Sequence, residues 1–284
     1  MAAESSLVTR DPSDAKRARR RAAGLFGSRA RVTSGQDHAR DAEPPVTETI
    51  HLHPTAALAE RVLLPGDPGR ALRLAQAVLE NPLMFNHHRG LWGYTGTASD
   101  GQQLTIQSTG MGGPSAAIVI AELAELGARR LLRVGTCGAL TSTLALGDLL
   151  VVTEAISGDG TSRALGAVGP VAPDAELLAA LISAGGGQAQ TGPVVSTDLF
   201  YDGPDGEQDE WIAAGAMAVE MEAATLFALA GRRGLEAAAL LVVSDLLLDG
   251  RNRISQEELL AAEHRLGETA VRALSTASVG SSAN

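Results

Sequence analysis

The 284-residue chain contains a single cysteine, Cys137, and a single lysine, Lys16. One cysteine excludes an internal disulfide and cannot by itself form a zinc site, which agrees with a reducing compartment. No apolar run approaches the roughly 20 residues that span a bilayer, and the N-terminus lacks the apolar core of a secretory signal. We therefore expect a cytoplasmic protein that makes no use of a membrane. Its hydrophobic content of 45% is sufficient for a substantial core in one domain or two.

Positive charge is scarce outside the N-terminal segment. Residues 1–44 hold 9 of the 23 Lys and Arg residues and 6 of the 33 Asp and Glu residues, which leaves 14 basic and 27 acidic residues elsewhere. An acidic body excludes broad nucleic-acid binding, although a few focused arginines can still hold a small anion. The basic cluster at residues 16–21 is interpreted as part of a disordered extension over residues 1–47, rather than a nucleic-acid contact or a targeting peptide. Residues 277–284 are predicted to form a frayed tail.

From residue 48 onward, short β-like runs alternate with longer helical patterns. Strands are predicted at residues 61–64, 104–108, 131–134, 149–153, 193–196 and 240–244. Helices are predicted at residues 69–79, 114–126, 222–232 and 256–274, where apolar residues recur at spacings of three and four. Loops rich in glycine and proline are predicted at residues 157–173, 185–187 and 202–206, the last as a mobile lid. This alternation indicates an α/β domain over residues 48–276.

The stretch at residues 63–70 ends an apolar run in a tight glycine turn, and Arg70 follows at the start of a helical pattern. Such a turn leaves backbone N–H groups uncovered, the helix start adds partial positive charge, and arginine adds a fork-shaped donor. The run at residues 131–138 repeats this pattern, with Arg133 and Thr136 beside its glycines. Two such turns indicate that the bound anion is a reactant.

Polar or glycine-rich segments follow four of the apolar runs. They are residues 66–70, 110–115, 135–136 and 244–245. Ligands of α/β sheets gather where the carboxyl ends of strands face one another. We therefore expect one cleft to collect all four segments.

Seven motifs occur in order along the chain. They are residues 65–70, residues 89–90 with 94–96, and residues 110–115, 133–138, 198–201, 219–224 and 243–245. Together they resemble the nucleoside phosphorylases that include hexameric purine nucleoside phosphorylases and uridine phosphorylases, over roughly residues 50–274. The resemblance implies a three-layer αβα sandwich on a central mixed sheet. It also implies a homohexamer, a trimer of dimers, whose active sites lie between subunits.

The reaction implied by this resemblance is phosphorolysis, a pentosyl transfer that serves purine salvage. Inorganic phosphate attacks the anomeric carbon of a nucleoside, which releases the base and forms ribose 1-phosphate. Phosphate is a co-substrate, and neither a cofactor nor a metal is expected. The resemblance assigns phosphate binding to Gly66, Arg70, Arg133 and Thr136, with Arg89 reaching in from a neighbouring subunit. Surface salt bridging is the alternative interpretation of the arginines, above all of Arg89.

For the ribose, the resemblance implies that Glu222 accepts hydrogen bonds from the 2′ and 3′ hydroxyls and that Met221 lines the same pocket. An acidic first helical turn is the alternative interpretation of the two glutamates. The 5′-hydroxyl contact is assigned to His51 of an adjacent subunit, with His53 left open because the spacing fits imperfectly.

For the base, Phe200 is expected to pack on the ring face, with Val219 and Glu220 beside it. Asp245 is expected to donate a proton or a hydrogen bond to N7 of a purine, the alternative being a capping aspartate after a strand. The family's assisting arginine corresponds by spacing to Glu258, whereas Arg251 and Arg253 lie nearer along the chain. The assisting residue is therefore left open.

Three other functions are weighed against purine phosphorolysis. A uridine phosphorylase would place an arginine soon after Gln208, and none follows there. A nucleosidase of the same superfamily would use water and lack the full set of phosphate-binding arginines. A regulatory protein would bind nucleosides without turnover. The choice among inosine, guanosine, adenosine and methylthioadenosine stays open, as does the size of the oligomer.

Overall fold

A computed structural model describes residues 48–276 of the chain. The interpretations of residues 1–47 and 277–284, including the basic cluster at residues 16–21, lie outside the described residues. The strands are β1 (Arg61–Leu64), β2 (Leu79–Asn86), β3 (Gly93–Ala98), β4 (Gln103–Gln107), β5 (Arg130–Ala139), β6 (Leu149–Ser157), β7 (Pro170–Val171), β8 (Ala189–Ser196), β9 (Ala218–Glu220), β10 (Glu236–Leu246) and β11 (Asn252–Arg253). The helices are α2 (Pro68–Val78), the 3-10 turn η1 (His88–Gly90), α3 (Gly113–Leu126), α4 (Gly160–Ala164), α5 (Ala175–Gly185), α6 (Glu207–Ala213), α7 (Ala223–Arg233) and α8 (Gln256–Thr276).

The strands form one mixed sheet. Strand β1 lies between β4 and β5 and is parallel to both, and β5 is also parallel to β10. Strands β2, β3 and β4 continue the sheet as an antiparallel extension. On the other side, β10 pairs with β6, β6 with β8, β8 with β9, and β9 returns to β5. These pairings close the five strands β5, β10, β6, β8 and β9 into a ring.

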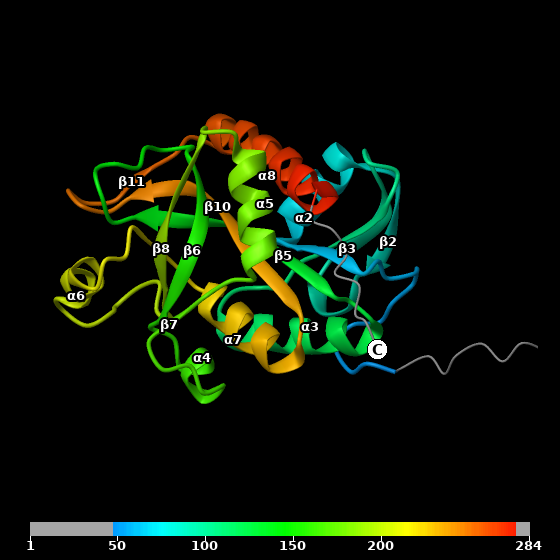
Figure 1. Cartoon of the computed structure of the whole chain (residues 1–284), viewed down its shortest axis with the longest axis horizontal. Helices are drawn as coiled ribbons and strands as arrows, with labels where there is room; N and C mark the ends of the chain where they lie inside the picture. The colour runs from blue at the N-terminus through cyan, green and yellow to red at the C-terminus, as the bar shows by residue number, and fades with distance from the viewer. Residues whose placement is uncertain (1–47, 277–284) are drawn as a thin grey trace, which may run out of the picture. The chain divides into compact units, whose positions relative to one another are not determined.

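Helices cover both faces of the sheet, as Figure 1 shows. Helices α2, α5 and α8 bury Leu74, Leu181 and Leu266 with Leu132 and Leu240 of the sheet in one apolar core. On the opposite face, α3 and α7 bury apolar side chains against β1, β5, β6 and β10 in a second core. Two separate cores on either side of one sheet confirm the predicted three-layer αβα sandwich.

The first glycine turn lies where the sequence predicts it, between β1 and α2. Asp67 is the N-cap of α2, and Pro68 occupies the first helical position, where its missing N–H costs nothing. The Asp67 carboxylate accepts from the N–H groups of Gly69 and Arg70, at 2.9 Å each. The expectation of uncovered N–H groups was therefore wrong for Gly69 and Arg70, because the Asp67 side chain accepts from both.

The second predicted glycine turn is also wrong, since β5 continues through it. Gly135 and Thr136 pair with Leu241 and Val242 of β10 in an unbroken parallel register. Glycine is required at position 135 for a different reason. A Cβ there would lie 2.8 Å from the Arg133 guanidinium carbon, so Gly135 makes room for that side chain to fold across the strand.

Several elements have no counterpart in the predictions. The strands β2, β3, β7, β9 and β11 and the helices α4, α5 and α6 were missed. Residues 157–173, predicted as a loop, contain α4 and β7. Residues 202–206 do precede α6 without regular structure, and their mobility stays a prediction.

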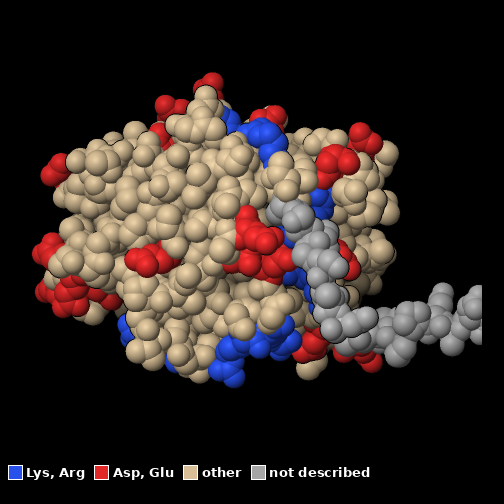
Figure 2. All heavy atoms as spheres, in the orientation of Figure 1, with Lys and Arg blue, Asp and Glu red and all other residues tan. Residues whose placement is uncertain are grey.

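Acidic side chains gather at the end of the described fold that carries α6, whose first turn contains Glu207, Asp209 and Glu210 (Figure 2). Among the described residues, no helix is long and apolar enough to cross a membrane.

Candidate active site

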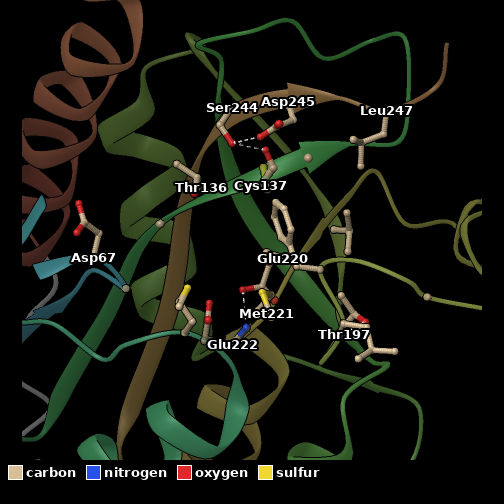
Figure 3. A pocket seen from close by; sticks show the side chains of 18 of the residues that line it. Asp67, Thr136, Cys137, Thr197, Glu220, Met221, Glu222, Ser244, Asp245 and Leu247 are labelled. Atoms are coloured by element: carbon tan, nitrogen blue, oxygen red, sulfur yellow. Dashed lines mark hydrogen bonds between the residues drawn. The ribbon is translucent and has the colours of Figure 1, made fainter. Parts of the chain in front are cut away.

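A cavity of about 650 Å³ opens at the carboxyl ends of β1, β5, β9 and β10. Its lining includes all but two of the predicted site residues. The predicted residues that line the cavity are Gly66, Arg70, Arg133, Thr136, Phe200, Val219, Glu220, Met221, Glu222 and Asp245. Figure 3 shows Ser244 and Asp245 on one side of the pocket and Glu220, Met221 and Glu222 on another. The structure therefore brings the predicted phosphate, ribose and base contacts into one space, as expected from the strand ends.

Arg70 is held at the cavity by a distant helix. Its Nε lies 2.8 Å from Oε1 of Glu263 in α8, and Glu263 is only 2% exposed. Arg73, one turn further along α2, binds the other oxygen of Glu263 at 2.8 Å. One buried carboxylate thus orients two guanidinium groups at the start of α2. Sequence reasoning missed Glu263, because it lies 193 residues from Arg70 and inside a helical pattern.

Gly66 separates β1 from α2 at the floor of the cavity. A Cβ at this position would lie 3.0 Å from the carbonyl oxygen of Gly110. The glycine therefore allows the turn after β1 to pack closely against the loop after β4. This contact places two of the predicted ligand-binding segments side by side.

Arg133 lies between two buried carboxylates. Its Nε is 2.8 Å from Oε2 of Glu220, an ion pair without the alignment of a hydrogen bond, and its Nη2 is 2.6 Å from Oε2 of Glu222. Burial opposes the charge on Arg133, but the two carboxylates outweigh it and raise the pKa of the guanidinium. Arg133 is thus permanently charged and fixed in position, which suits a group that orients an anion.

Glu220 has its oxygen atoms occupied within the fold. It accepts a short hydrogen bond from the hydroxyl of Ser196 and further bonds from the backbone N–H groups of Glu222 and Ala223. These contacts place Glu220 under the first turn of α7, in addition to its ion pair with Arg133. Glu220 therefore holds Arg133 and the start of α7 in position, in addition to the base contact predicted for it.

Glu222 is the N-cap residue of α7, which begins at Ala223. Its Oε1 accepts from the backbone N–H of Gly112 at 2.5 Å, and its Oε2 faces Arg133. Burial is the main cause that raises the pKa of Glu222, and neighbouring Glu220 adds to it, while Arg133 and the Gly112 N–H oppose the rise. The side chain is buried but lines the cavity, so its carboxylate faces both Arg133 and the cavity.

Asp245 owes its orientation to a bulge in β10. The register with β5 shifts between Val243 and Asp245, and a bulge of this kind re-aims the side chain that follows. The Ser244 hydroxyl donates to Oδ2 of Asp245 at 2.7 Å. The buried Oδ1 accepts no aligned hydrogen bond but lies 3.2 Å from Nε of Arg253 and 3.5 Å from Nε of Arg251.

The structure narrows the choice of the residue that could assist Asp245, which the sequence left open. Glu258 does not approach Asp245 and instead accepts from the Ser255 hydroxyl at the start of α8. Arg251 and Arg253 lie beside Asp245, on the turn between β10 and β11 and on β11 itself. Phe200 is half exposed at the same end of the cavity, with the Arg251 guanidinium 4.3 Å from its ring centre.

His51 and Arg89 do not line the cavity. The His51 ring nitrogen Nδ1 lies 2.6 Å from Oε1 of Glu122 in α3. The same carboxylate accepts hydrogen bonds from the backbone N–H groups of His51 and Leu52. Burial opposes the charge on Glu122, but these hydrogen bonds outweigh it and lower the pKa of the carboxyl. His88, the neighbour of exposed Arg89, contacts the carbonyl oxygen of His51 at 3.1 Å and stacks on His53. Both residues predicted to serve a neighbouring subunit therefore lie away from the cavity, and His51 contacts His88, which precedes Arg89 in the chain.

The cavity also contains residues that sequence reasoning did not assign. They include Met111, Cys137, Thr197, Gln208, Trp211 and Leu247. Gln208 and Trp211 come from α6, which no periodic pattern marked because it is a single short helix. Cys137 is buried within β5, where burial raises the pKa of its thiol well above the usual range. It is therefore a packing residue of the cavity wall rather than a nucleophile.

Comparison with known proteins agrees with this geometry. The model of the Phosphorylase superfamily matches residues 60–278. A guanosine phosphorylase of Halorubrum lacusprofundi is 40% identical over 198 residues, covering 68% of this chain and 81% of the relative. DeoD-type purine nucleoside phosphorylases of Clostridium beijerinckii and Geobacillus kaustophilus are 36% and 38% identical, over 75% and 72% of this chain and 92% and 88% of their own lengths. The chain, in which Arg70, Arg133, Glu220, Glu222 and Asp245 line one cavity, belongs to the phosphorylase superfamily.

Proposed function

We propose that this protein is a pentosyltransferase that catalyses the phosphorolysis of purine nucleosides, releasing the free base and forming ribose 1-phosphate. The observation that carries the proposal is the cavity itself. Anion-binding Arg70 and Arg133, the carboxylate of Glu222 and the acid Asp245 all line one space large enough for a nucleoside and a phosphate. Relatives whose names specify purine nucleoside and guanosine phosphorylases support the choice of a purine.

Phosphate binds between the arginines at the start of α2 and on β5. Arg70 is oriented by Glu263, and Arg133 by Glu220 and Glu222, so little ordering remains to be done when the anion enters. Thr136 and Gly66 complete this end of the cavity. Fixed bidentate donors orient one phosphate oxygen towards the sugar carbon instead of merely attracting the anion.

The sugar lies against Glu222 and Met221. Vicinal 2′ and 3′ hydroxyls suit a single carboxylate, which accepts from both. As the bond between the anomeric carbon and the base nitrogen breaks, its electron pair goes to the base and the sugar becomes cationic. The Glu222 carboxylate and the phosphate stabilise this charge more in the transition state than in the ground state. A phosphate oxygen then forms the new bond to the same carbon.

The base leaves at the Asp245 end of the cavity. Phe200 packs on its face, and Asp245 donates to N7, which neutralises the negative charge that the base acquires. Val219 and Glu220 border the base. Inorganic phosphate is the only co-substrate in this scheme, and no cofactor takes part.

His51 and Arg89 complete the site of a neighbouring subunit in this proposal. Neither lines the cavity, and His51 contacts His88, the residue before Arg89, which supports a contribution of both across a subunit boundary. We accordingly propose a homohexamer, a trimer of dimers, with shared active sites. The reaction fits a role in cytoplasmic purine salvage, and the single cysteine fits a reducing compartment.

The experiment that tests the proposal measures base release from a purine nucleoside with and without phosphate. Phosphate-dependent release is expected, whereas equal release without phosphate would indicate a nucleosidase. Asp245→Asn is expected to lower kcat by about a hundredfold or more, the usual range for loss of a general acid. Asp249→Asn, an exposed change on the turn after β10, is the matched control and should stay within about twofold of the parent.

A further inference from the structure

Arg251 joins the two groups that border the base end of the cavity. Its Nε lies 3.5 Å from Oδ1 of Asp245, and its guanidinium carbon lies 4.3 Å from the ring centre of Phe200. The side chain lines the cavity and is 37% exposed. Arg253 approaches the same oxygen of Asp245, but its side chain is 68% exposed. Arg251 is therefore the arginine whose donors border the space for the base.

Both oxygen atoms of the Asp245 carboxyl group lie beside hydrogen-bond donors. Asp245 Oδ2 accepts from Ser244, and the buried Oδ1 faces two guanidinium groups without an aligned hydrogen bond to either. The carboxyl group of Asp245, which must carry a proton to donate to N7, thus has two positive charges beside it. Guanidinium groups only donate hydrogen bonds, so donors exceed acceptors where the base edge must lie.

The two classes of purine differ along this edge. A 6-oxopurine offers two acceptors, N7 and O6, whereas a 6-aminopurine offers the acceptor N7 beside an amino donor. A guanidinium matches the pair of acceptors and faces the amino group donor to donor. During bond cleavage the 6-oxopurine spreads negative charge onto O6, which a cation stabilises further.

We propose that Arg251 donates to O6 of the base and makes the enzyme selective for 6-oxopurine nucleosides, such as inosine and guanosine, over adenosine and its 5′-methylthio derivative. This inference rests on the proposed function, since it requires the base to lie between Phe200 and Asp245. When the base packs on the Phe200 ring, the Arg251 guanidinium shifts from this ring towards O6 of the base. Arg253 supports Asp245 from the solvent side and does not read the base.

Three nucleosides separate the contact with O6 from other effects. Inosine carries O6, purine riboside carries hydrogen at this position, and adenosine carries the amino group. The kcat/KM of each is measured for the parent, for Arg251→Met and for Arg253→Met. In the parent, inosine should exceed purine riboside and adenosine by about tenfold or more, the effect of one charge-assisted hydrogen bond.

In Arg251→Met the advantage of inosine over purine riboside should disappear, because the O6 donor is gone. Arg253→Met should lower all three values together and keep their ratios, since it changes only the support of Asp245. A parent that prefers adenosine, or an Arg251→Met variant that keeps the inosine advantage, overturns the inference and leaves phosphorolysis itself standing. A parent that releases no base from any nucleoside in a phosphate-dependent manner contradicts the proposed function instead.

Discussion

Glu263 Oε1 lies 2.8 Å from Nε of Arg70, although α8 and the start of α2 are far apart in the sequence. The second oxygen of the same carboxylate holds Arg73. Arg70, to which we assign phosphate binding, is therefore held in place by a buried carboxylate that does not itself line the cavity. Preorganised donors of this kind bind an anion without a cost in ordering the side chain.

Glu263→Gln should weaken phosphate binding because the amide cannot hold both guanidinium groups as ion pairs. We expect the KM for phosphate to rise by about tenfold, the effect of one charge-assisted contact, with a smaller change in the KM for the nucleoside. Initial rates over a phosphate series measure the split. Glu257→Gln on the exposed side of α8 is the control, and a Glu263 variant that raises both KM values equally would refute the positioning role.

Removing the charge of Arg133 should destabilise the fold. Arg133→Met leaves the buried carboxylates of Glu220 and Glu222 without their cation, and breaking a buried pair in this way costs about 3–5 kcal/mol. The free energy of unfolding in denaturant measures this loss. Arg129→Met, an exposed change just before β5, should cost less than about 0.5 kcal/mol. Equal stability of the two variants would contradict the buried arrangement.

The pH dependence of stability should report Glu222. Burial raises the pKa of Glu222 in the folded protein, so the contribution of this group to stability is fully present below about pH 4 and is lost as pH rises through the raised value. Glu222→Gln cannot titrate. In buffer without phosphate, the Tm of the parent minus that of the variant should fall as the pH is raised from acidic to neutral. A difference that grows with pH would show that the pKa is lowered instead.

Hybrid oligomers should reveal the shared sites. Co-assembly of Arg89→Ala and Asp245→Asn subunits creates sites in which Asp245 and a neighbour's Arg89 are both intact. Activity above the sum of the two separate variants is expected from oligomers purified with two different tags. The two variants mixed without co-assembly serve as the control. Confirmed hybrids with no recovery would place Arg89 outside the active site.

Much of the fold could be predicted because apolar periodicity is a local signal. Strand β1 has the predicted bounds of residues 61–64, and α8 begins at the predicted Gln256. Strand β5 extends five residues past its prediction, since pairing with β10 overrides the glycines at positions 135 and 138. The antiparallel strands β2 and β3 were missed because neither sequence alternates between apolar and polar residues: β2 contains a proline, and β3 consists largely of glycine and threonine.

The candidate site was predictable where polar residues lie at or just after the end of a strand, as Asp245 does in β10 and Arg70 does after β1. What could not be predicted depends on contacts between distant segments. Glu263 reaches Arg70 only through the packing of α8 on the sheet, and the bulge that turns Asp245 towards the cavity exists only in the paired strand. The choice of Arg251 and Arg253 over Glu258 likewise follows from the path of the β10–β11 turn.

Phosphorus NMR of the protein incubated with inosine and inorganic phosphate tests the central claim most directly. The account predicts that the phosphate signal is converted into that of ribose 1-phosphate in equal amount to the hypoxanthine released. Release of hypoxanthine with free ribose and an unchanged phosphate signal would contradict it.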